Sequence, residues 1–122
     1  AYEVIIQATN SVGNSANSNM ETGTPSAAPT VPSAPTITGI TPGDGQLSVA
    51  FDAPTSDGGS AITDYQYSVD NGTTFTSAAS TVSPLVLTGL TNDTAYDVII
   101  QATNSVGNSA NSNMVTGTPV AV

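Results

Sequence analysis

Apolar and polar residues alternate along most of the chain with a period of two. The clearest case is the segment 95–104, AYDVIIQATN, in which Tyr96, Val98, Ile100 and Ala102 share one face. Such alternation is typical of a β-strand with one buried face. Similar patterns predict strands in the segments 35–41, 46–52, 63–70, 73–78, 83–91 and 111–118, and no segment has the apolar spacing of an amphipathic helix.

Turn-forming residues separate these segments. Residues 42–45 read PGDG, and Asn71-Gly72 is a pair that tight hairpins favour. A loop rich in Gly, Ser and Asp occupies residues 53–62. Seven short strands at this spacing predict an all-β fold in which two sheets pack as a sandwich.

The start of the chain is repeated at its end. Residues 1–25 and 95–119 are identical at 23 of 25 positions, and only Glu3/Asp97 and Glu21/Val115 differ. The lag of 94 residues is about the size of a small β domain. We therefore expect one complete domain over 35–119, with the last hairpin of a preceding repeat in 1–25. A proline-rich linker, 26–34, joins the two, and 120–122 begin the next linker.

Several motifs of the complete unit resemble a known family. They are PSAPTI, GDGQLSVAF, DGGSAITDYQYSVDNGT and, most specifically, LTGLTNDTAYDVIIQATNSVG. The sequence from Pro32 to Pro119 resembles a fibronectin type III repeat of the bacterial or archaeal extracellular kind. The resemblance implies a seven-stranded immunoglobulin-like sandwich, with strands at about 35–41, 46–52, 62–69, 73–78, 84–89, 95–104 and 110–117.

The resemblance also implies a structural corner formed by Leu90, Thr94 and Tyr96. The hydroxyl of Tyr96 should bond to the backbone where the fifth strand of the domain turns into the sixth. The family often has Trp on its second strand and in the short strand after the hairpin, where Phe51 and Phe75 stand here. We expect Phe75 to anchor that short strand.

The charge of the chain excludes several functions. It has nine acidic residues and no Lys, Arg or His. The phosphates of nucleic acids and anionic membrane surfaces should therefore be repelled. Cys is also absent, so neither a disulfide nor a common pair of nucleophile and base can form. We expect no catalytic residue, no enzymatic activity, no nucleic-acid partner, no membrane insertion, and no cofactor apart from a candidate Ca²⁺ ion.

Three carboxylates are candidates for binding that ion. Asp52 ends one predicted strand, Asp57 lies in the following loop and Asp64 begins the next strand. They could share a hard cation at one end of the sandwich. The alternative is that they are ordinary solvated acids near turns, and the chain has no DxDxDG loop.

Two N-glycosylation sequons begin at Asn71 and Asn92. Both fall in predicted turns, where we expect the side chains to be exposed. The alternative is chance, because the chain is rich in Asn and Thr.

The hairpin 1–25 needs a partner, because a two-stranded hairpin is marginal in water. Val4 and Ile6 should be buried against strands from a neighbouring copy, in the same chain or by strand addition between chains. We expect a structural repeat of an extracellular or cell-surface array that forms a filament, matrix or stalk. Two alternatives stay open: a spacer module of a secreted polysaccharide-degrading enzyme, and an adhesin module that binds a glycan or protein.

Overall fold

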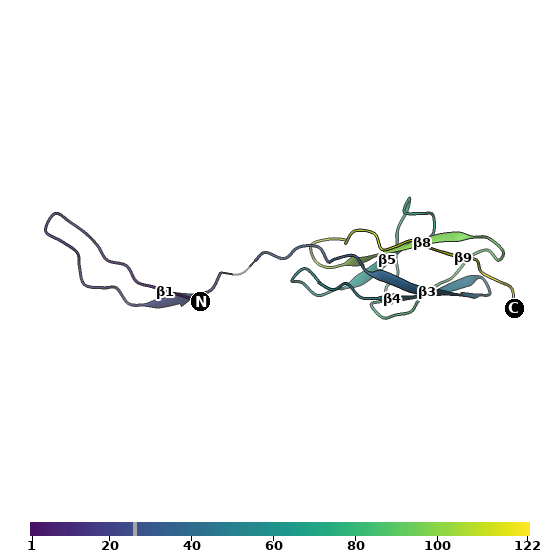
Figure 1. Cartoon of the computed structure of the whole chain (residues 1–122), viewed down its shortest axis with the longest axis horizontal. Helices are drawn as coiled ribbons and strands as arrows, with labels where there is room; N and C mark the ends of the chain where they lie inside the picture. The colour runs from purple at the N-terminus through teal and green to yellow at the C-terminus, as the bar shows by residue number, and fades with distance from the viewer. Residues whose placement is uncertain (26) are drawn as a thin grey trace.

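The computed structural model describes residues 1–25 and 27–122; residue 26, where the predicted linker begins, lies outside them. Every regular element in those residues is a β-strand (Figure 1). The described part of the chain therefore contains no helix able to span a membrane. The all-β prediction is confirmed.

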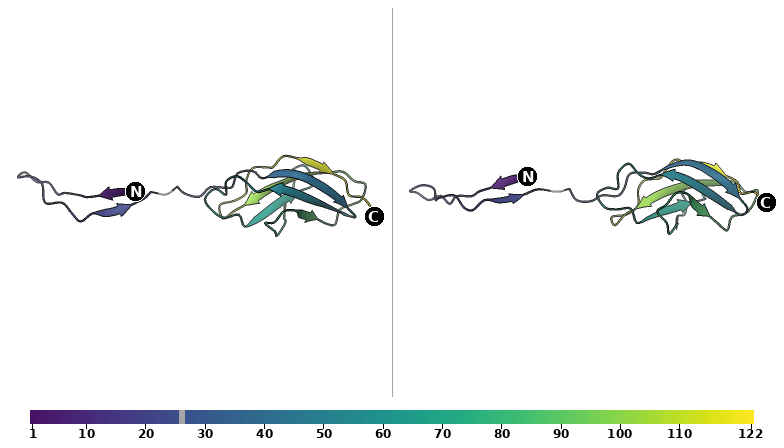
Figure 2. Two further views of the ribbon diagram at one scale, coloured as in Figure 1. Left: turned by 60° about the horizontal axis from the view of Figure 1, so that its bottom comes forward. Right: turned by 90° about the horizontal axis from the view of Figure 1, so that it is seen from below.

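The complete domain is a sandwich of seven strands in two layers (Figure 2). A three-stranded sheet has the order β3-β4-β7, and a four-stranded sheet has the order β6-β5-β8-β9. All neighbouring strands are antiparallel. The strands are β3 (Thr36–Gly43), β4 (Gln46–Asp52), β5 (Asp64–Ser68), β6 (Thr76–Ser77), β7 (Leu85–Leu87), β8 (Tyr96–Thr103) and β9 (Val115–Gly117).

The alternating residues form the core, as their period predicts. On β4, Leu47, Val49 and Phe51 are buried while the residues between them are half-exposed. The rings of Phe51 and Tyr65 pack across the two sheets with centroids 4.5 Å apart. Each fully buried aliphatic side chain contributes about 1.5–3 kcal/mol. The core consists of Ile37, Leu47, Val49, Phe51, Tyr65, Leu85, Leu87, Val98, Ile100 and Ala102.

Three predicted strands are at most half as long in the structure as the sequence pattern indicates. The segment 73–78 keeps only β6, 84–89 keeps only β7, and 110–117 keeps only β9. Phe75 is half-buried, lies outside β6 and is not part of the core, so its predicted role as the anchor of that strand is wrong. Ala78 packs against the core instead, and its backbone N–H donates to the Tyr65 carbonyl at 2.8 Å.

The remaining strands, β1 (Tyr2–Val4) and β2 (Glu21–Gly23), pair with each other as a separate two-stranded sheet. In Figure 1 this hairpin stands clear of the sandwich. Every described residue of the segment 1–25 is exposed except Ser18, which is half-exposed. The structure therefore contains one complete domain and one hairpin without a core.

Candidate functional site

The hairpin 1–25 has the same conformation as the hairpin formed by β8 and β9. Tyr2 pairs with Gly23 as Tyr96 pairs with Gly117, and the bridge between Thr9 and Asn14 matches that between Thr103 and Asn108. The side-chain bonds match too. Ile6 N donates to Ser18 Oγ at 3.0 Å, and Ile100 N donates to Ser112 Oγ at 2.9 Å. The two copies thus share their backbone pairing as well as their sequence.

Serine hydroxyls explain why regular strand pairing in both hairpins stops short of the connecting loop. Ser109 and Ser112 each give a backbone N–H to β8 and accept a β8 N–H through Oγ. They are three residues apart, but their partners Ala102 and Ile100 are two apart. The extra residue is accommodated as in a bulge. This is why β9 is shorter than predicted.

Burial is what distinguishes the two hairpins. Val98 and Ile100 are 0% exposed, whereas their counterparts Val4 and Ile6 are 53% and 69% exposed. The residues of β8 are covered by the opposite sheet and paired with β5. The hairpin 1–25 presents the same apolar face with nothing in the described residues packed on it.

A second feature is the linker, which is bound to the end of the domain where β8 finishes. Asn104, only 4% exposed, donates through Nδ2 to the carbonyl oxygens of Thr30 at 2.7 Å and Asp57 at 2.8 Å. Its Oδ1 accepts N–H bonds from Val106 and Gly107. One buried amide therefore joins the linker, the loop after β4 and the loop after β8.

Gly58 makes this close approach possible. Its carbonyl accepts from Thr30 N at 2.8 Å, and its φ is +76°. A Cβ on Gly58 would lie 2.2 Å from the Thr30 carbonyl oxygen, which is far inside van der Waals contact. Further along the linker, Ser33 N donates to the Ser56 carbonyl at 3.0 Å. The linker from Thr30 onward is thus an ordered part of the domain.

The other end of the domain holds the start of the next linker. Pro119 is buried and its carbonyl accepts from Asp93 N at 2.8 Å. Val120 N then donates to the Gly43 carbonyl at 3.1 Å. Linker residues are therefore fixed at both ends of the sandwich.

The predicted corner residues lie beside this second end. The Tyr96 hydroxyl accepts a hydrogen bond from Thr91 N at 2.9 Å, which ties the start of β8 to the preceding turn. Leu90 packs against the core, and its N–H donates to the Gly45 carbonyl at 2.9 Å. Thr94 is exposed. Tyr96 and Leu90 hold the corner, and both are built into the fold rather than presented to a ligand.

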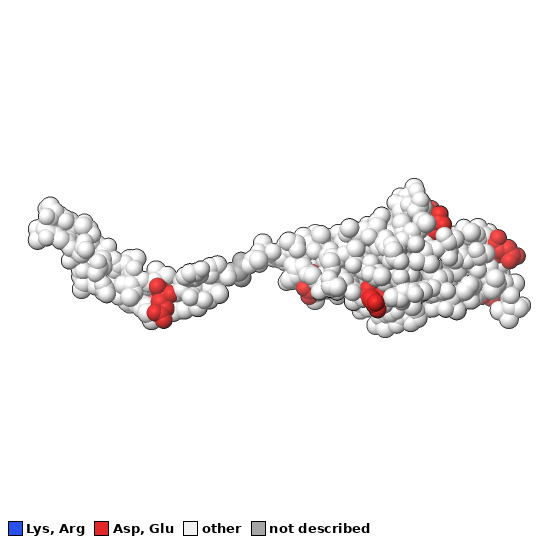
Figure 3. Space-filling view, in the orientation of Figure 1, with Lys and Arg blue, Asp and Glu red and all other residues white. Residues whose placement is uncertain are grey.

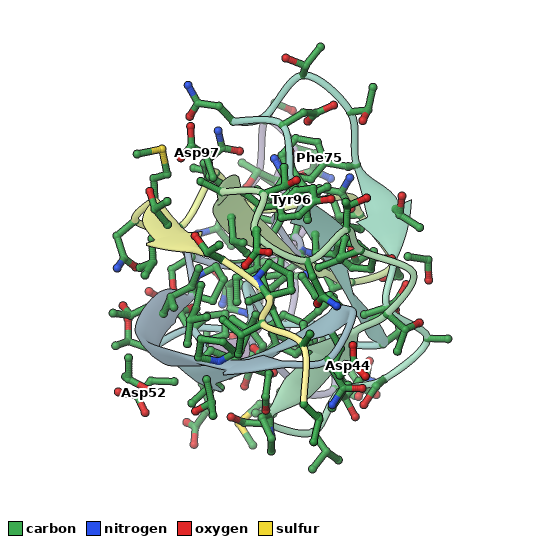
Figure 4. The ribbon with its side chains drawn as sticks, turned by 90° about the vertical axis from the view of Figure 1, so that its right-hand side faces the viewer. Asp44, Asp52, Phe75, Tyr96 and Asp97 are labelled. Carbon is green, nitrogen blue, oxygen red and sulfur yellow. The ribbon has the colours of Figure 1, made fainter. Side chains whose placement is uncertain are left out.

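The structure does not bring the three candidate calcium ligands together. No group of three carboxylates in residues 1–25 and 27–122 is arranged to hold a metal ion. Asp57 Oδ1 accepts from Gly59 N at 2.9 Å, and Asp64 Oδ2 accepts from the Ser77 hydroxyl. Asp52 and Asp44 point outward from different sides of the domain (Figure 4). Calcium binding stays a prediction from the sequence, and the described residues do not form a site for the ion.

The two sequons differ in their surroundings. Asn71 is exposed at a turn with φ of +59°. Asn92 is half-buried; it accepts from Gly45 N and donates to Asp44 Oδ1, each at 2.8 Å. A glycan would replace one hydrogen of the Asn92 amide, which is half-buried and already bonded to Asp44, so accessibility favours Asn71. Glycosylation itself stays a prediction.

The acidic side chains are spread over the surface. Figure 3 shows separate red positions on the face in view, without a continuous patch. Asp70 is the one with a clear shift: the Ser68 hydroxyl and then Thr74 bond to its carboxylate and lower its pKa from 3.8 to about 2. These bonds fold the turn between β5 and β6. Two surface hollows, of about 400 and 380 Å³, have no carboxylate in their lining.

The sequence matches the fibronectin type III domain family over residues 29–118. The chain belongs to this family. The match begins one residue before Thr30 and so includes the linker segment bound by Asn104. The fibronectin type III domain is a non-catalytic module, in agreement with the prediction that the chain is not an enzyme.

Solved structures agree on the fold. The fibronectin type III domain of human fibronectin type III domain containing protein 3 is 22% identical with a TM-score of 0.58, and the match covers 83% of this chain and 94% of that one. A structure of titin kinase and its flanking domains is 21% identical with a TM-score of 0.60, over 73% of this chain and 17% of that one. These similarities concern the fold alone.

One relative in sequence is Endoglucanase B of Cellulomonas fimi, which is 35% identical over 131 aligned residues. The alignment covers 100% of this chain, so it includes the hairpin 1–25 as well as the complete domain. The chain spans 12% of the length of that relative.

Sequence reasoning did not predict the role of Asn104 in binding the linker. Asn104 and Gly107 belong to the motif LTGLTNDTAYDVIIQATNSVG that resembles the family, but the motif does not indicate what Asn104 binds. The contact to Thr30 could not be foreseen, since it joins residues 74 apart in sequence.

Proposed function

We propose that this chain is a section of a tandem array of fibronectin type III units that acts as a non-catalytic spacer outside the cell. The observation that carries the proposal is the contrast between two nearly identical hairpins. Val98 and Ile100 are fully buried, and Val4 and Ile6 are bare. A preceding copy of strands β3–β7 would cover Val4 and Ile6 as this copy covers their counterparts.

The linker contacts support an array with closely spaced units. By the 94-residue lag, Pro25 corresponds to Pro119, whose carbonyl is bound at the far end of a domain. Thr30 is bound at the near end of the next domain. Four positions, 26–29, separate Pro25 from Thr30, and an extended chain spans at most about 18 Å between the two. Neighbouring units in such an array would therefore lie close together.

The acidic composition suits this role. With nine acidic residues and no basic ones, neighbouring units repel one another and stay soluble. The absence of Lys and Arg leaves the chain without a cleavage site for trypsin-like proteases.

The array could stand alone as a cell-surface or filament component, or it could separate domains of a secreted polysaccharide-degrading enzyme. The similarity to Endoglucanase B favours the second possibility, because the alignment continues through the hairpin, the linker and the domain. The coding sequence on either side separates them: further copies alone favour the array, and a catalytic domain favours the enzyme spacer.

A direct test extends the chain by placing a copy of residues 26–94 before Ala1. That copy followed by 1–25 restores the 26–119 sequence with two substitutions. Calorimetry should show about twice the unfolding enthalpy of the 122-residue chain, because enthalpy scales with the number of folded residues. An enthalpy equal to that of the parent chain would mean that the hairpin does not complete a second domain, and the proposal would fail.

A further inference from the structure

Except at Glu3 and Glu21, the hairpin 1–25 has the same side chains as the hairpin that fills a site in this same molecule. That site is the surface on β3, β4, β5 and β7 that β8 and β9 occupy. The apolar residues that enter the core, Val98, Ile100 and Ala102, are matched by Val4, Ile6 and Ala8. The register of the pairing is matched as well. Within residues 1–25 and 27–122, the packing of the copy 95–119 thus shows which surface this sequence can cover.

We propose that the hairpin 1–25 of one molecule can take the place of β8 and β9 in a second copy of this chain. The inference rests on the equivalence of the two hairpins used in the proposed function. It adds a second partner for the hairpin, namely the strands β3 to β7 of another molecule, which the hairpin reaches by strand exchange between chains. The exchanged hairpin would pair with β5 and cover β4 as β8 does.

Geometry favours a second copy over closure within one chain. Within one chain, Gly23 would lie where Gly117 lies, beside Tyr96, while Thr30 stays bound to the loop at the opposite end of β8. Tyr96 and Thr103 are about 24 Å apart along β8. The seven residue steps from Gly23 to Thr30 span at most about 25 Å when fully extended. No slack is left to pass around side chains, whereas a second molecule has no such constraint.

One sequence difference between the two hairpins favours β8 and β9 over the hairpin 1–25 in this site. Val115 is half-buried and packs against the core, opposite Val98. The exchanged hairpin would place Glu21 there. A carboxylate against an apolar core is disfavoured, and β8 also has the advantage of being attached to its own domain. The unaltered chain should therefore be a monomer with its hairpin 1–25 bare.

The test weakens the packing of β8 and β9 and measures whether the hairpin 1–25 of another molecule takes their place. Four full-length chains are compared: unaltered, Ile6→Asp, Ile100→Asp and the double variant. Ile100 is 0% exposed and Ile6 is 69% exposed, so only Ile100→Asp disrupts the packed domain directly. The readouts are hydrogen exchange at the Leu47 and Val49 amides of β4 and molecular mass by light scattering over a range of concentrations.

The proposal predicts that Ile100→Asp keeps β4 protected in assemblies of two or more chains whose fraction grows with concentration. The double variant should lose that protection, and Ile6→Asp should behave like the unaltered monomer. Three results would overturn the proposal. The β4 amides of Ile100→Asp could exchange as fast as those of the double variant, or they could be protected in a monomer. The third is that Ile100→Asp and the double variant form assemblies to the same extent. Failure here leaves the calorimetric test of the tandem array unaffected, because that test involves completion within one chain. If both fail, the equivalence of the two hairpins is wrong.

Discussion

Asn104 and Thr30 are joined by a 2.7 Å hydrogen bond across 74 residues of sequence. The bond joins the loop after β8 to the linker that precedes β3, and it is made by an almost fully buried amide. The linker is thereby ordered by the domain that follows it. This arrangement lets a fibronectin type III unit fix the direction from which the chain enters.

Replacing Asn104 tests how much this amide contributes. Asn104→Ala removes the four hydrogen bonds of a buried amide, so it should reduce the free energy of unfolding by about 2–3 kcal/mol. Exchange of the Thr30 amide should also become faster. The matched control is Asn10→Ala, at the same position of the hairpin 1–25, which should leave the stability of the domain unchanged. Equal effects from both substitutions would contradict the role given to Asn104.

Two adjacent glycines separate backbone strain from the linker contact. Both have positive φ, +76° at Gly58 and +92° at Gly59, so Ala at either position is strained by about 1–2 kcal/mol. Only at Gly58 would the new methyl group collide with the Thr30 carbonyl; the nearest atom at Gly59 is 3.8 Å away. Gly58→Ala should therefore destabilise by about 1–3 kcal/mol more than Gly59→Ala in denaturant unfolding. If the two variants lost the same free energy of unfolding, the linker at Thr30 would be able to move away from the new methyl group at little cost.

Val4 and Val98 occupy equivalent positions in the two hairpins, so the same substitution at each shows how much burial contributes to stability. Val98→Ala should lower the free energy of unfolding by about 2 kcal/mol, because it removes packed methyl groups from the core. Val4→Ala should change it by less than about 0.5 kcal/mol. Urea midpoints of the two variants provide the measurement. A comparable loss for Val4→Ala would show that the hairpin 1–25 is packed against something in the 122-residue chain.

The turn at Asp70 should make stability depend on acid. Its pKa is lowered to about 2 in the folded chain from an ordinary 3.8, so the folded state favours the carboxylate. The resulting stabilisation is complete above about pH 4 and is lost as the pH falls through about 2. Asp70→Asn should be less stable than the parent at neutral pH, and this difference should shrink toward pH 2. A carboxyl titration near 3.8 by NMR would contradict the assignment.

Much of this architecture follows from residue patterns, and the exceptions have definite causes. The period of two predicted the buried face of β4, where burial alternates along the strand. On β8 it predicted the burial of Val98, Ile100 and Ala102, but Ile99 on the other face is buried as well. It overestimated β9, because Ser109 and Ser112 replace regular backbone pairing with hydroxyl bonds. It could not predict the binding of Thr30 by Asn104, or that Asp52, Asp57 and Asp64 would not converge, because those outcomes depend on how distant loops meet.

Hydrogen exchange in the extended chain, with a copy of residues 26–94 placed before Ala1, tests the central claim most directly. If residues 1–25 are the last two strands of a fibronectin type III unit, the amides of Ile6 and Ala8 should become as protected as those of Ile100 and Ala102. In the 122-residue chain they should exchange far faster than those counterparts. Fast exchange at Ile6 and Ala8 in both chains would contradict the account.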